Sequence, residues 1–141
     1  MTTLAKDTPR VLVTGDMNSI PMIKQDTVYE GAMVGIEAAT GHGRPLVAGD
    51  IFAGHSIFKV DNELGTVGAE KDIRLRSGRY RLVCTLTGVA ITDVGVPVYA
   101  SDDDTLTKTS ASNSFVGRVS RYITTNTAEI EFDTLKPVAT T

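Results

Sequence analysis

Short runs of alternating apolar and polar residues make up most of the chain, and glycine, proline, asparagine or aspartate separate them. The alternation is clearest near the end, where Ala128, Ile130 and Phe132 alternate with Glu129 and Glu131. A period of two residues is typical of half-buried strands, and no long segment keeps a helical period. We therefore expect an all-β protein, a single-domain β-sandwich or partly closed β-barrel of about eight short strands.

The clearest local geometry is predicted at Ser77 and Gly78, which can form a two-residue hairpin turn between two alternating strands. The flanking strands carry apolar residues at every second position. In this hairpin the apolar residues would line the inner face and contribute to the core: Ile73, Leu75, Tyr80, Leu82, Cys84 and Leu86.

The same hairpin would place four arginines on its outer face, with Arg76 opposite Arg79 and Arg74 opposite Arg81. Like charges opposite each other on paired strands are unfavourable, so something must offset them. One explanation is carboxylates elsewhere on the same surface. The other is an acidic partner surface, which guanidinium groups bind in a bidentate manner. These four arginines are candidate partner-binding residues.

Residues 1–27 have a weaker pattern than residues 28–141, which we expect to form the β-rich domain. Prolines and turn-forming residues surround a single brief apolar run in this first segment. We expect an extended N-terminal arm that orders against a partner, for example by adding a strand to an exposed sheet edge. The alternative is that the segment packs as a first strand on its own domain. Candidate partner-binding residues of the arm are Arg10, Val11, Leu12 and Val13.

Composition narrows the range of functions. The chain has 141 residues, 41% of them hydrophobic, which is enough for one domain with a substantial core. A formal net charge of −3 argues against direct binding of nucleic acid, which needs dense lysine and arginine on one face. The sequence has no apolar stretch of membrane-spanning length and no signal-peptide pattern, so we expect a protein made in the cytoplasm that does not contact membranes.

Residues that could support chemistry are few. Cys84 is the only cysteine and stands in an apolar alternation, which predicts a buried, inert thiol. His42 and His55 are the only histidines, and neither has a carboxylate or thiol at metal-ligand spacing. Residues 41–46 lack the pattern of a phosphate-binding loop, and the aspartates at 102–104 lack that of a calcium loop. We expect turns at both places, with no enzyme activity, catalytic residue, metal or cofactor.

Several short motifs nevertheless occur in an order that resembles one family. An A-G-D-x-F-A-G turn leads to a V-D-N stop and a Tyr-Arg-Leu strand. An isoleucine-threonine-aspartate turn, a V-Y-A-S-D-D segment and an aromatic-V-G-R-V run follow. In this order and within residues 28–133, the chain resembles the capsid decoration, or cement, proteins of tailed bacteriophages. The matching segments are 48–54, 60–62, 78–82, 91–93, 97–103 and 115–119.

This resemblance implies a structural role in the virion. It implies a β-rich protein on the outer surface of the capsid, where it binds the major capsid protein of the expanded, DNA-filled head and stabilises it. The resemblance also implies neighbouring copies clustered as a homotrimer on the shell. Another structural virion protein, a head fibre base or a tail tube component, is the alternative, because it would share the β class and the lack of chemistry.

Overall fold

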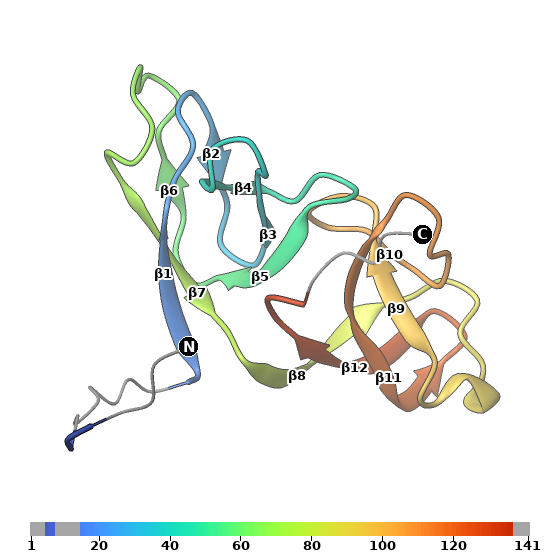
Figure 1. The fold of residues 1–141 in the computed structure, drawn as a ribbon. Coiled ribbons are helices and arrows are strands. Elements are labelled where there is room, and N and C mark those ends of the chain that lie inside the picture. The colour runs from blue at the N-terminus through green and yellow to red at the C-terminus, as the bar shows by residue number, and fades with distance from the viewer. Residues whose placement is uncertain (1–4, 8–14, 137–141) are drawn as a thin grey trace.

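The computed structural model describes residues 5–7 and 15–136, and these residues form an all-β fold (Figure 1). Within these described residues, all of the named strands pair in antiparallel fashion, and one short 3-10 turn, η1 (Ile91–Asp93), interrupts the strands. None of the sheets formed by the described residues closes into a barrel, as expected for a sandwich. The strands are β1 (Met17–Pro21), β2 (Thr27–Val28), β3 (Met33–Ile36), β4 (Gly43–Pro45), β5 (Ile51–Ser56), β6 (Val60–Asp61), β7 (Asp72–Arg76), β8 (Arg79–Thr85), β9 (Pro97–Ala100), β10 (Leu106–Thr107), β11 (Ser114–Thr124) and β12 (Thr127–Asp133).

Two five-stranded sheets form the body of the molecule. The N-terminal sheet has the order β1-β7-β5-β3-β4, and the C-terminal sheet has the order β10-β9-β11-β12-β8. Strands β2 and β6 form a small third sheet beside the N-terminal one. The prediction of an all-β fold is therefore confirmed, although the described residues contain more strands than the eight expected.

Two hydrophobic cores are linked by strands β3 and β5. Adjacent residues of a strand point to opposite faces, so Met33 and Phe52 pack into the C-terminal core while Val34 and Ala53 pack into the N-terminal core. This explains why β5 is apolar on both sides. The C-terminal core also contains Leu46, Leu86, Val89, Val98, Ala100, Val116, Val119, Ala128, Ile130 and Phe132, and the N-terminal core contains Met22, Val28, Ala32, Ile73 and Leu75.

The predicted hairpin at Ser77 and Gly78 is wrong. These residues connect β7 in the N-terminal sheet to β8 in the C-terminal sheet, and the two strands do not pair with each other. Gly78 has a φ of +82°, and its amide donates a hydrogen bond to Oγ1 of Thr134. The alternation of side chains identified two strands correctly, but it carries no information about which strand pairs with which.

The expected boundary at residue 27 is also wrong for the residues that the structure describes. β1 pairs with β7 along its whole length, from Met17 opposite Arg76 to Pro21 opposite Asp72. Met22 follows β1 and has no exposed surface. Residues 17–27 therefore belong to the fold. The candidate partner-binding residues of the expected arm, Arg10, Val11, Leu12 and Val13, lie outside the described residues.

Candidate interaction surface

The outer face of the C-terminal sheet carries a network of ion pairs across three strands. Glu131 on β12 lies between Arg118 on β11 and Arg81 on β8, with nitrogen–oxygen distances of 2.9 and 3.7 Å. Glu129 likewise lies 3.1 Å from Arg121 and 3.8 Å from Arg81. The pairing of β12 with both neighbours places these carboxylates opposite the arginines.

The network continues at the end of β12. Arg79 and Lys136 each approach the Asp133 carboxylate to 3.5 Å. For Arg79 and Arg81, the explanation by carboxylates on the same surface is therefore confirmed. These two arginines compensate charges within the protein itself.

Arg74 and Arg76 differ from the other arginines. Both are exposed on β7, and neither contacts a carboxylate among the residues that the structure describes. Arg44, by comparison, holds the Asp50 carboxylate in a two-pronged contact of 2.8 and 3.0 Å and also reaches Glu37. The five other described arginines all have a carboxylate partner, so Arg74 and Arg76 are the two whose charge remains available.

Large apolar side chains are exposed on loops at the small sheet of β2 and β6. Tyr29 and Phe58 are 60% and 59% exposed, and the Lys59 ammonium lies 5.2 Å from the centre of the Tyr29 ring. Leu64, in the loop after β6, is 95% exposed, and Val67 in the same loop is also exposed. Exposed aromatic and aliphatic side chains on loops are suited to contact with another protein.

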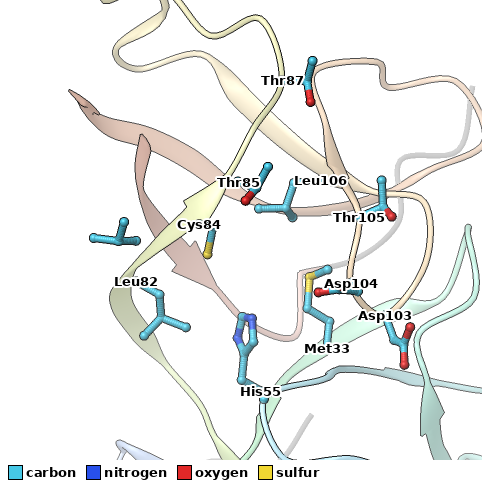
Figure 2. Close-up of a pocket in the computed structure, with 12 residues that line it drawn as sticks. Met33, His55, Leu82, Cys84, Thr85, Thr87, Asp103, Asp104, Thr105 and Leu106 are labelled. Carbon is cyan, nitrogen blue, oxygen red and sulfur yellow. The ribbon is translucent and has the colours of Figure 1, made fainter. Parts of the chain in front are cut away.

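A groove of about 570 Å³ lies beside β8, the outermost strand of the C-terminal sheet (Figure 2). Leu82 and Cys84 of β8 form one wall, and the segment before β10 with Leu106 forms the opposite wall. His55 and Met33 lie at its base. No motif in the sequence indicates this groove, because it arises from the pairing of strands that are distant in the chain.

His55 is buried at the junction of the two sheets, among the rings of Phe52, Tyr80 and Phe132. Its Nδ1 atom lies 2.6 Å from the Tyr80 hydroxyl. Burial, followed by the charge of Arg76, lowers the pKa of His55 to about 4. Burial also raises the pKa of the Tyr80 hydroxyl, which therefore stays protonated. The neutral imidazole and the protonated hydroxyl therefore share one hydrogen bond, whose donor is set by the tautomer of the imidazole.

The other residues considered for chemistry are Cys84, the aspartates at 102–104 and His42. Cys84 packs against the C-terminal core but is half-buried, so the expected burial of its thiol is only partial. Burial together with the Asp104 charge raises the pKa of the thiol to about 11. A raised pKa keeps the thiol protonated and poorly reactive. Asp102 accepts hydrogen bonds from the amides of Asp104 and Thr105, which confirms the expected turn. His42 lies against Gly68, in the loop before β4.

Within residues 5–7 and 15–136, no group of three or more histidine, cysteine, aspartate or glutamate side chains could hold a metal ion. No helix among the same residues is long and apolar enough to cross a membrane. Comparisons of the chain with protein-family models, curated proteins and solved structures found no match.

Proposed function

We propose that this chain is a bacteriophage capsid decoration protein that binds the outer surface of the major capsid protein shell and stabilises the expanded, DNA-filled head. The observation that carries the proposal is the pair of exposed arginines, Arg74 and Arg76, which lack a carboxylate partner in the described part of the chain. The order of sequence motifs, which resembles the decoration family, supports the same function.

An acidic patch on the shell would complement these two arginines. A guanidinium group binds a carboxylate through two parallel hydrogen bonds, which fixes orientation as well as providing attraction. Residues on a rigid strand lose little freedom when they bind, and β7 lies between β1 and β5 inside a sheet. Arg74 and Arg76 are therefore suited to a fixed contact with a repeated surface.

The exposed apolar loop residues have a second role in this proposal. A small protein on a symmetric shell gains affinity when it contacts several subunits, because the second contact is made at a high effective concentration. We assign Tyr29, Phe58 and Leu64 to contacts between neighbouring copies, which would cluster as trimers on the shell. Aromatic side chains are enriched at such interfaces.

The experiment uses expanded heads of the phage that encodes the chain, assembled without it. Purified protein is added, heads are sedimented, and bound copies per capsid subunit are measured. We expect saturable binding with a high copy number for the natural sequence and a large loss for the double variant Arg74→Glu and Arg76→Glu. Decorated heads should also break at a higher temperature than bare heads.

A control with the same change in net charge is Lys24→Glu combined with Lys136→Glu, because both lysines are exposed and lie outside β7, and the contact that Lys136 loses is a long surface ion pair of 3.5 Å with Asp133. This control should bind like the natural sequence. Absence of binding to expanded heads would contradict the proposal. One ring or a few copies per particle would instead indicate a tail tube component or a head fibre base.

A further inference from the structure

β8 is an edge strand with an open row of backbone groups in the part of the chain that the structure describes. It pairs with β12 alone, over seven residues and without a bulge. At one end of this ladder the amide of Leu86 donates to the carbonyl of Asn126, and at the other end the amide of Thr134 donates to the carbonyl of Gly78. Successive residues point their backbone groups to alternate sides, so the even-numbered residues of β8 bond to β12. The odd-numbered residues direct their amides and carbonyls to the open edge: Arg79, Arg81, Val83 and Thr85.

The other edges of the two large sheets are protected against a further strand. In β1 the residues that point away from β7 include Pro21, which has no N–H group, and Ser19, whose amide donates to a neighbouring side chain. In β4, Pro45 points away from β3, and the carbonyl of Gly43 already accepts the amide of Ile23. β10 has only two residues. Among the described residues, β8 is therefore the edge that can accept another strand.

The charges along β8 do not repel a second strand. Arg81 lies near Glu129 and Glu131 of β12, and Arg79 is also paired with a carboxylate of that strand. A compensated charge gives little of the repulsion by which charged residues usually protect an edge. Val83, the next open position, is apolar and 61% exposed. The edge therefore fits a strand that has no strong net charge and an apolar residue at its centre.

We propose that two copies of this chain pair through β8, with the two strands antiparallel and related by a two-fold axis at Val83. In this arrangement Val83 lies opposite Val83 of the second copy, and Arg81 lies opposite Thr85 of the second copy. The odd-numbered residues exchange backbone hydrogen bonds, and the two C-terminal sheets join into one continuous sheet. The open edge of each copy is thus satisfied by the same edge of the other.

The sequence of β8 selects this register among those that a two-fold axis allows. An axis at Arg81 would place two arginines directly opposite each other, and an axis at Leu82 would place them on a diagonal, where they are still neighbours. An axis at Cys84 or Thr85 would shorten the overlap of the two strands, because β8 ends at Thr85. The axis at Val83 keeps the arginines of the two copies apart and retains most of the strand in the contact.

This contact differs from the one assigned above to the exposed loops. A two-fold contact uses the same surface on both copies and joins two chains only, so it cannot by itself form a trimer. The loop residues Tyr29, Phe58 and Leu64 lie outside β8 and stay exposed for other neighbours. The pairing requires no shell, so it goes beyond the proposed function.

The isolated protein tests the pairing in the absence of heads. Sedimentation velocity over a range of concentrations should show a monomer–dimer equilibrium for the natural sequence. Val83→Lys places two like charges opposite each other and removes an apolar contact, so it should raise the dissociation constant of the dimer about tenfold or more. Val83→Glu should have the same effect. An equimolar mixture of the two variants should restore the dimer, because each lysine then lies opposite a glutamate.

The matched control is Val94→Lys, because Val94 is also an exposed valine and follows η1, outside β8. This variant should dimerise like the natural sequence. A natural sequence that stays monomeric at all concentrations would overturn the proposal. An oligomer that Val83→Lys does not weaken, or a mixture of the two Val83 variants that does not dimerise, would overturn it as well.

A disulfide gives a second measurement, which tests the register. Even-numbered residues of the two β8 strands form pairs that do not exchange hydrogen bonds, in which the Cα atoms are about 4.5 Å apart, as a disulfide requires. The proposed register places Leu82 opposite Cys84 of the second copy. In Leu82→Cys, each pair of thiols should lose two hydrogens to oxidised glutathione, which becomes two glutathione molecules, and the product should be a dimer linked between positions 82 and 84. The control Thr85→Cys points to the other face and should not form this bond.

The position of the disulfide separates the possible results. A dimer of Leu82→Cys linked through position 82 of both chains, or a Cys84–Cys84 dimer of the natural sequence, would overturn the axis at Val83. A disulfide between positions 82 and 84 of one chain, in a monomer, would overturn the pairing itself. Both experiments use the protein without heads, so their results do not depend on whether the protein decorates a capsid.

Discussion

The two sheets use similar arginine-containing strands in different ways. β7 has the sequence DIRLR and β8 begins with RYRL, so each carries two exposed arginines at alternate positions. β8 pairs with β12, which places Glu131 opposite Arg81. β7 pairs with β1, which places Ser19 opposite Arg74. The neighbouring strand, and not the arginine strand itself, decides whether the charge is compensated internally or remains available for a partner.

This difference has more consequence for binding than for stability. Exposed ion pairs typically contribute about 0–1 kcal/mol each, because solvent screens them and long side chains lose entropy. The network on the C-terminal sheet therefore stabilises the fold only slightly. Its main effect is to leave this face without uncompensated charge, whereas β7 presents two positive groups.

The substitution expected to lower stability most, Phe52→Ala, tests whether the two sheets fold as one unit. Phe52 lies on β5 of the N-terminal sheet but packs into the C-terminal core against Phe132. Phe52→Ala should lower the free energy of unfolding by about 3–5 kcal/mol through lost contacts and a cavity. Because β5 joins both cores, urea unfolding followed by circular dichroism should show one transition shifted to lower urea.

Ile73→Ala is the matched variant in the N-terminal core, where Ile73 has no exposed surface. It should cost about 2–5 kcal/mol and also leave a single transition. Two separate transitions in either variant would show that the sheets unfold independently. In that case the two sheets would be two separate domains instead of two parts of one domain.

Local alternation predicted the strands well, and the pairing of strands poorly. Ala128, Ile130 and Phe132 were expected to face inward, and all three are buried. The strands and the turn at 102–104 could be predicted because each depends on residues that are close together in the sequence. The hairpin at Ser77 and Gly78 was wrong because the turn residues there instead serve a bend between two sheets.

The candidate site shows the same limit. The acidic alternation of β12 and the four arginines were visible in the sequence, but only the fold pairs Glu131 with Arg81 and leaves Arg74 exposed. The His55–Tyr80 contact joins two residues that are 25 positions apart in the sequence and lie in different sheets. No periodicity in the sequence encodes such a contact, because it depends on how the two sheets pack in the tertiary structure.

The next prediction is that stability depends on pH through His55, at the junction between the sheets. The pKa of His55 is lowered from 6.5 to about 4, mainly by burial. As the pH falls below 6.5, the unfolded chain binds a proton that the folded chain does not bind. The free energy of unfolding should therefore decrease between pH 6.5 and 4, by about 3 kcal/mol in total from this residue, and be constant above that range. Urea unfolding at several pH values measures the slope.

The control for this slope replaces both members of the contact, His55→Phe together with Tyr80→Phe. Replacing both partners avoids an unpaired buried hydroxyl. Other groups, such as the carboxyl of Asp102, whose pKa is lowered by backbone hydrogen bonds, still titrate in this variant. The difference between the two pH profiles isolates His55. If the free energy of unfolding of the double variant decreased with pH as steeply as that of the natural sequence, the acid sensitivity would come from carboxyl groups and not from His55.

The smallest expected changes in stability come from arginine substitutions that compare a paired arginine of the C-terminal sheet with an unpaired arginine of β7. Arg118→Ala removes the 2.9 Å contact with Glu131 and should lower the free energy of unfolding by at most about 1 kcal/mol, with less effect at high salt. Arg74→Ala removes no ion pair in the described part of the chain, so its effect should stay within about 0.5 kcal/mol and should not depend on salt. Thermal unfolding of both variants at low and high salt compares them. A salt-dependent loss for Arg74→Ala equal to that of Arg118→Ala would mean that β7 has an internal partner, and Arg74 would then not be free to bind a shell.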